Sequence, residues 1–169
     1  MTENQSVEAT SMTGETGELQ RWETASELLG SRSSVWVATV RSDGRPHVMP
    51  VLPAWLDGNV YFSTSHSSQQ ARNLLQNPHS VVTVRDDRIE LVVEGRVEQV
   101  TTEAELQRIA YRYHEQHGWD VEVRNGGFES EQKAPTAGEV PFIVFSIAPT
   151  RAFGLPVDGS FHPTRWRFA

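Results

Sequence analysis

Apolar residues of this chain gather in short runs rich in β-branched and aromatic side chains, and tight turns separate the runs. Such runs are typical of strands. We predict about six strands, at residues 35–40, 47–55, 60–64, 80–86, 89–100 and 142–155. Ser42-Asp43-Gly44, Asp57-Gly58 and Asp86-Asp87 supply turns between neighbouring strands. Because two-residue turns join antiparallel neighbours, parallel βαβ units do not fit and an antiparallel sheet is expected.

Other segments show helical periodicity. About three short helices are predicted, at residues 19–29, 67–76 and 102–117. Gly30, Asn77-Pro78 and Gly118 end them, and Thr102-Glu103-Ala104-Glu105 reads as a capping box at the start of the third. Residues 120–140 are rich in glycine, proline and charge without a clear period, so a loop is expected there.

Prolines and glycines refine the sheet. Pro50 and Pro53 cannot donate ladder hydrogen bonds, so 47–55 must be an edge or bulged strand, and Gly95 inside 89–100 indicates a bulge or sharp bend. A short, strongly bent antiparallel sheet tends to close into a barrel. The strands are apolar on both faces, which indicates that both faces are covered, one of them by a partner subunit. The fold class is therefore mainly β with flanking helices.

Length and composition limit the function classes. The 169 residues suffice for one domain, and we assign residues 1–18, which are polar and acidic, to a disordered tail and residues 19–169 to the folded domain. The start lacks the pattern of a signal peptide, and no stretch is long enough to span a membrane. The absence of cysteine excludes disulfides and thiolate sites, and is compatible with the cytoplasm. A formal net charge of −7 argues against nucleic acid as a partner.

The junction between the strand at 60–64 and the helix at 67–76 carries the most informative chemistry. Ser63, Thr64, Ser65, Ser67 and Ser68 crowd the point where the helix begins. The first turn of a helix has unpaired N–H groups and the positive end of the dipole, so this corner can hold a phosphate. Helix capping alone is the competing explanation, because Ser67-Ser68-Gln69-Gln70 also fits a capping box in which Gln70 reaches back to Ser67.

No constellation of catalytic or metal-binding residues is evident. His47 lies in a strand and is either a packed residue or a donor to a cofactor carbonyl. His114 and His117 are three apart on a predicted helix, but no third metal ligand accompanies them. We therefore expect neither a catalytic side chain nor a metal site.

Several segments together resemble the pyridoxamine 5′-phosphate oxidase-like split-barrel family, which includes flavin and deazaflavin oxidoreductases. The resemblance is carried by WVATVRSDGRPHVMPV (36–51), VYFSTSHSSQQARNLLQNP (60–78), IELVVEGRVEQV (89–100), the join GRVEQVTTEAEL and the C-terminal PTRWRF (163–168). It spans about residues 20–168 and looks closest to actinobacterial members that use a deazaflavin. It implies a six-stranded antiparallel split β-barrel that forms a homodimer, with two cofactor sites at the subunit interface.

The resemblance also implies the residues of the cofactor site. The strand His47–Val51 would run along the ribityl chain and ring, while Ser63, Thr64 and Ser68 would contact the phosphate. Glu90 stands where the oxidase branch often has a ring-contacting glutamine, and Arg165 and Trp166 lie in a tail that approaches the cofactor, often from the other subunit. The complete set implied is His47, Met49, Pro50, Val51, Ser63, Thr64, Ser68, Gln69, Gln70, Arg72, Asn73, Glu90, Arg165 and Trp166.

One departure from the family concerns charge. Gln69 and Gln70 are neutral where the family commonly has basic residues, so Arg72 or another arginine must compensate. The resemblance implies an oxidoreductase that binds FMN or the deazaflavin coenzyme F420 and transfers a hydride to or from a small organic substrate, with the 120–140 loop as a candidate lid. The alternatives are a non-catalytic carrier of such a cofactor, or a haem binder with His47 or His162 as iron ligand.

Overall fold

The computed structural model describes residues 6–131 and 140–169. The strands in chain order are β1 (Val7–Ser11), β2 (Val35–Val40), β3 (Pro46–Val51), β4 (Ala54–Leu56), β5 (Asn59–Ser65), β6 (His79–Arg85), β7 (Ile89–Val100), β8 (Glu122–Arg124), β9 (Gly127–Glu129), β10 (Phe142–Pro156) and β11 (Thr164–Phe168). The helices are α1 (Trp22–Ser31), α2 (Gln69–Gln76) and α3 (Glu103–His117). None of these helices, in the part of the chain described, has the length and apolarity to cross a bilayer.

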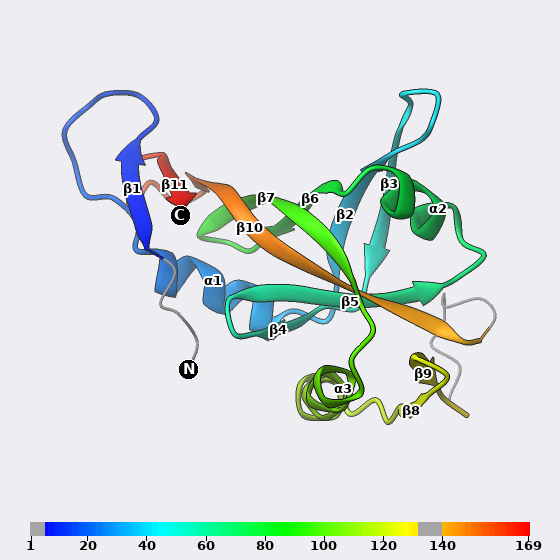
Figure 1. Cartoon of the computed structure of the whole chain (residues 1–169). Coiled ribbons are helices and arrows are strands. Elements are labelled where there is room, and N and C mark those ends of the chain that lie inside the picture. Colours follow the sequence, from blue (N-terminus) through cyan, green and yellow to red (C-terminus); the bar gives the residue numbers. More distant parts are fainter. Residues whose placement is uncertain (1–5, 132–139) are drawn as a thin grey trace.

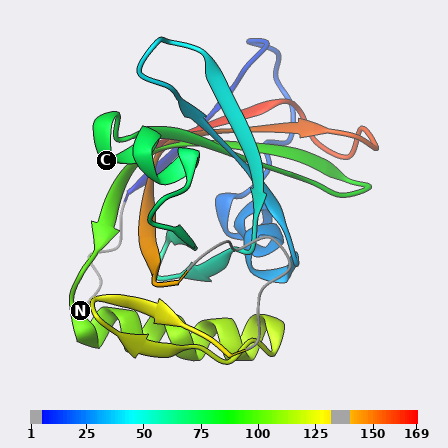
Figure 2. The same cartoon turned by 90° about the vertical axis from the view of Figure 1, so that its right-hand side faces the viewer.

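The strands form one strongly curved antiparallel sheet (Figure 1). Its main path runs β1-β11-β10-β7-β6-β2-β3, while β5 pairs with β10 and with β4. The curved sheet wraps around an interior but remains open, and α3 lies with β8 and β9 below it (Figure 2). The expected mainly β split barrel with flanking helices is thereby confirmed.

The predicted strand at 47–55 is two strands, β3 and β4, which are separated by Leu52 and Pro53. β3 pairs only with β2 and ends the main path, as its prolines require of an edge strand. The irregularity expected at Gly95 lies instead in the facing strand, where the β10 register shifts between Pro149 and Arg151.

The prediction that residues 1–18 are a disordered tail is wrong for part of that segment. Residues Val7–Ser11 form β1, which pairs antiparallel with β11 from Val7 opposite Phe168 to Ser11 opposite Thr164. Glu8 and Ala9 are exposed at the edge of the sheet, while Val7 packs against the core. Tertiary pairing decides this strand, and local composition does not reveal it.

Part of the predicted loop at 120–140 is also wrong, because β8 and β9 form a hairpin. Its turn residues Asn125 and Gly126 have φ of 53° and 73°, which is the backbone conformation of a type I′ turn. Phe128 of β9 is fully buried and anchors the hairpin against Tyr113 of α3. The candidate lid therefore lies partly in this hairpin, and its segment 132–139 is outside the described residues.

Two apolar clusters hold the molecule together. The larger fills the barrel interior and includes Leu29 of α1, Phe62 of β5 and Trp166 of β11. The smaller lies between the sheet and α3 around Tyr113, whose hydroxyl donates to the Leu52 carbonyl at 2.9 Å. Burial raises the pKa of that hydroxyl.

Candidate cofactor site

The corner between β5 and α2 is capped by Ser68. The Ser68 Oγ accepts a hydrogen bond from the Ala71 N–H at 3.0 Å. The capping box predicted for Ser67 and Gln70 is therefore wrong by one position, because Ser68 is the N-cap. Gln70 instead turns inward, with 4% of its surface exposed, and its Nε2 has no hydrogen-bond partner within the described residues. A buried amide without a partner costs about 1–3 kcal/mol, so the inward position of Gln70 is energetically unfavourable.

The hydroxyl groups of the corner are ordered by one another. Thr64 Oγ1 donates to Ser68 Oγ at 3.0 Å, and the hydroxyls of Ser65 and Ser67 lie 3.1 Å apart. The Ser68 Oγ thus accepts two bonds, which leaves its own proton to donate outward. The N–H groups of Gln69 and Gln70 are in the first turn, where no intrahelical carbonyl is available. The corner therefore presents several donors and little competing acceptor capacity, as an anion requires.

Arg72 supplies a positive charge beside this corner. Its Nη1 donates to the Ser67 carbonyl at 2.8 Å and its Nη2 to the Gln69 Oε1 at 3.2 Å. These contacts hold the guanidinium over the turn that precedes α2. Arg72 is thus the cation beside the corner to which the resemblance assigns the phosphate.

A buried hydrogen-bond chain ties α2 to the edge strand. Asn73 Nδ2 donates to Thr39 Oγ1 at 2.8 Å, and Gln69 Nε2 donates to Asn73 Oδ1 at 2.7 Å. Thr39 Oγ1 lies 3.3 Å from the His47 carbonyl and 3.4 Å from the His47 Nδ1. Asn73 and Thr39 are each 2% exposed, so this chain fixes β3 relative to the phosphate corner.

His47 is held neutral at neutral pH. Burial lowers the pKa of its imidazole, and the nearby positive charge of Arg41 lowers it further. With Nδ1 directed at Thr39, Nε2 is the ring nitrogen that remains for a ligand. Met49 and Val51 share this face of β3, whereas Pro50 lies on the other face opposite Trp36. The unpaired edge of β3 also offers backbone N–H and C=O groups.

Three residues of the implied set lie away from this corner. Glu90 is at the start of β7 opposite Arg85, and no hydrogen bond or ion pair of the described residues joins it to the corner. Arg165 lies on β11 opposite Phe153. Trp166 is fully buried, and its Nε1 donates to the Gln20 carbonyl at 3.1 Å. The assignment of Trp166 to cofactor stacking is not supported, because its ring is enclosed by the core of its own chain.

Three histidines elsewhere have local partners. His114 Nδ1 lies 2.7 Å from Asp120, and His117 Nε2 lies 2.6 Å from the Pro53 carbonyl. His162 is near Glu15, with 3.9 Å between Nδ1 and Oε2, in the segment that leads into β11. No group of three metal-ligating side chains occurs within residues 6–131 and 140–169.

The sequence analysis missed Thr39. The alternation of residues along β2 could have revealed it. Val35, Val37 and Thr39 all face the interior, and Thr39 is the polar one of the three. A hydroxyl at a core-facing position needs a buried partner, and Asn73 provides it.

Comparison with known proteins agrees with this geometry. A family described as pyridoxamine 5′-phosphate oxidase matches residues 22–153. A pyridoxine/pyridoxamine 5′-phosphate oxidase from Pseudomonas entomophila is 36% identical over 72 residues, which are 41% of this chain and only 34% of that protein.

Two solved structures share the fold. An FMN-binding protein related to pyridoxamine 5′-phosphate oxidase, from Nostoc punctiforme, superposes with a TM-score of 0.57 and 21% identity, covering 87% of this chain and 89% of that one. An F420 reductase gives a TM-score of 0.53 and 26% identity, covering 75% of this chain and 94% of that one. With the family match extending from α1 into β10, this chain belongs to the pyridoxamine 5′-phosphate oxidase-like family.

Proposed function

We propose that this protein binds FMN or coenzyme F420 and is an oxidoreductase that transfers a hydride between the cofactor and a small organic substrate. The observation that carries the proposal is the α2 corner, where first-turn N–H groups lie beside the Ser68 hydroxyl and the Arg72 guanidinium. These are donors without acceptors, the chemistry that a phosphate group satisfies.

Different residues of this chain bind the phosphate and the ring system of the cofactor. Ser68, Arg72 and the first turn of α2 hold the phosphate, while the free edge of β3 directs its backbone groups at the ring system. His47 offers a neutral imidazole, so it provides a hydrogen bond without placing a positive charge beside the ring. The cofactor supplies the hydride chemistry, and the protein supplies orientation and a site from which water is excluded.

The low charge of the corner favours an exchangeable cofactor. Arg72 is the one cation that α2 contributes, and Gln69 and Gln70 add only neutral donors. Charge-assisted hydrogen bonds are about twice as strong as neutral ones, so each missing cation weakens retention of a phosphate. The similarity to an F420 reductase supports F420 as the preferred partner, with FMN as the alternative.

Replacing Arg72 by alanine is expected to weaken cofactor binding about tenfold or more, since a charged hydrogen bond contributes about 1.5–3 kcal/mol. Fluorescence titration with F420 and with FMN measures the change. Arg124→Ala, at an exposed arginine of β8, is the matched control and should leave affinity unchanged. Equal affinities of Arg72→Ala and the parent protein would contradict the assigned role. A second assay follows the absorbance of the reduced cofactor after a quinone or an unsaturated carbonyl compound is added. An oxidoreductase consumes the reduced cofactor, whereas a carrier binds it without turnover.

The outer face of the sheet supports a homodimer. Pro50, Trp36, Thr83, Val92 and Phe153 form one continuous row across five strands. Trp36, between Pro50 and Thr83 in this row, is 52% exposed, which is unusual for so large an apolar side chain. Contiguous apolar surface of this kind marks an interface. We propose that a second copy covers it, which also brings Glu90 and Arg165 of one subunit toward the site of the other.

Trp36→Asp is expected to convert the dimer into monomers, because a charge at the centre of an apolar interface cannot be desolvated without a partner. Sedimentation equilibrium at a fixed protein concentration measures the mass. Tyr111→Asp, on the exposed side of α3, serves as the control and should leave the mass of the assembly unchanged. A parent protein that sediments as a monomer would contradict the proposal.

A further inference from the structure

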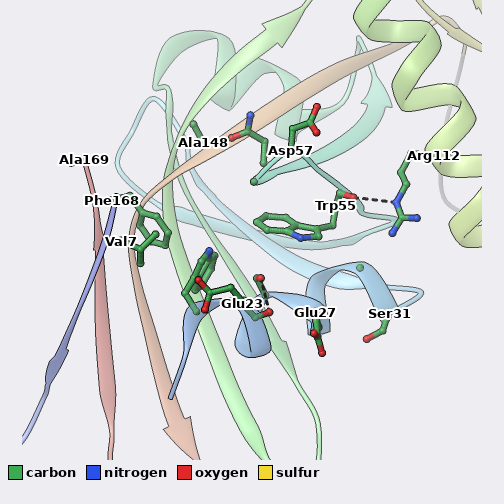
Figure 3. Close-up of a pocket in the computed structure, with 15 residues that line it drawn as sticks. Val7, Glu23, Glu27, Ser31, Trp55, Asp57, Arg112, Ala148, Phe168 and Ala169 are labelled. Atoms are coloured by element: carbon green, nitrogen blue, oxygen red, sulfur yellow. Dashed lines mark hydrogen bonds between the residues drawn. The ribbon is translucent and has the colours of Figure 1, made fainter. Parts of the chain in front are cut away.

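A second cavity lies on the far side of the barrel from α2. It has a volume of about 940 Å³ and is formed by α1, the turn between β4 and β5, α3, and the strands β10 and β11 (Figure 3). None of the residues assigned to the cofactor site lines it. The volume is in the range of small-molecule sites, which extends from about 300 to 1,000 Å³.

Three aromatic side chains line this cavity. The ring of Trp22 is 6.2 Å from that of Trp55 and 4.8 Å from that of Phe168, with interplanar angles of 76° and 77°. All three rings are only partly buried against the core, so part of their surface faces the cavity. Figure 3 shows Trp55 and Phe168 on different sides of the cavity. The rings meet edge to face and are only partly buried, so aromatic surface borders the cavity.

The charged groups of the cavity are mainly carboxylates. Glu23, Glu27 and Asp57 line it together with one guanidinium, that of Arg112. The Arg112 Nε is engaged with the Trp55 carbonyl at 3.1 Å, and Asp57 is paired with Arg108 outside the cavity. Glu27 has no ion pair within the described part of the chain. With three carboxylates against the one guanidinium of Arg112, the cavity lining carries a net negative charge.

We propose that this cavity binds an organic cation, a quaternary or protonated amine with an apolar body. A cation placed against the face of tryptophan is attracted by the ring quadrupole, and the attraction grows when water is displaced. The carboxylate of Glu27 adds charge complementarity, and the same carboxylates repel phosphates. The cavity is thus opposite in chemistry to the α2 corner and does not depend on the function proposed there.

The test uses choline as the probe and its uncharged dimethylbutanol isostere as the control ligand, in calorimetric titrations of the full chain at low salt. Choline is expected to bind about threefold to thirtyfold more tightly than the isostere, which is the range of a cation–π contact. Glu27→Gln should reduce this difference by the share of the carboxylate and remove most of its salt dependence, whereas Glu98→Gln, an exposed carboxylate of β7, should change nothing.

Three outcomes would overturn the proposal. These are no binding of choline, equal binding of choline and its isostere, or equal losses in Glu27→Gln and Glu98→Gln. Glu27 is exposed on α1, so its replacement is compatible with folding, and thermal melting verifies that. Titration of Glu27→Gln with F420 and FMN should give the parent affinity, which separates this site from the cofactor site.

Discussion

Trp166→Ala is expected to lower the free energy of unfolding by about 3–5 kcal/mol, the range for removing a fully buried large aromatic side chain. The ring has no exposed surface, lies 5.5 Å from the ring of Trp22, and donates a hydrogen bond to the Gln20 carbonyl. Gly154 shows how closely the site is filled, because a Cβ there would lie 2.6 Å from Trp166 Cη2. Truncation therefore leaves a cavity that the neighbours cannot close. Urea unfolding at fixed protein concentration measures the loss.

Tyr111→Ala provides the control for Trp166. Tyr111 is 65% exposed on α3, and its replacement should change the free energy of unfolding by no more than about 0.5 kcal/mol. The result also separates the two roles considered for Trp166. A variant with parent stability but without cofactor affinity would mean that the ring faces the ligand and not the core.

Asn73→Ala is expected to lower the free energy of unfolding by about 1–3 kcal/mol and to weaken cofactor binding as well. The substitution removes the bonds to Thr39 Oγ1 and from Gln69 Nε2, in a position that is 2% exposed. Because the same chain of bonds fixes β3 relative to α2, losing it loosens two sides of the proposed site together. Chemical unfolding and cofactor titration measure the two effects on one sample.

Two variants show whether the Asn73 donor matters. Asn73→Asp keeps the volume and the acceptor for Gln69 but lacks the N–H that reaches Thr39, so it should weaken binding as the alanine variant does. Leu75→Ala, at a 61% exposed position of the same helix, should leave affinity unchanged. The positioning role of Asn73 fails if the aspartate variant binds with parent affinity.

The sequence by itself determined the parts that depend on local pattern. The β2 and β7 boundaries agree with the prediction to the residue, because β-branched runs there end at strong turn or helix signals. The hydroxyl cluster before α2 also follows from local chemistry, since Ser68 caps the helix that its own chain begins. The three helices and the mainly β class therefore needed no contact between distant residues, whereas the six predicted strands fall short of the eleven that the described residues form.

Only the tertiary structure decided which side chains meet. β1 pairs with a strand more than 150 residues away in the chain, so the polarity of Val7–Ser11 gave no sign of it. Trp166 faces the core and not the cofactor because its register with Ala152 directs it inward, and a shift of one residue would turn it outward. The contact between Asn73 and Thr39, across 34 residues, likewise depends on how α2 lies on the sheet. Local propensity predicts the central strands and the helices, but edge strands such as β1, the strand register and the docking of α2 depend on packing of the whole chain.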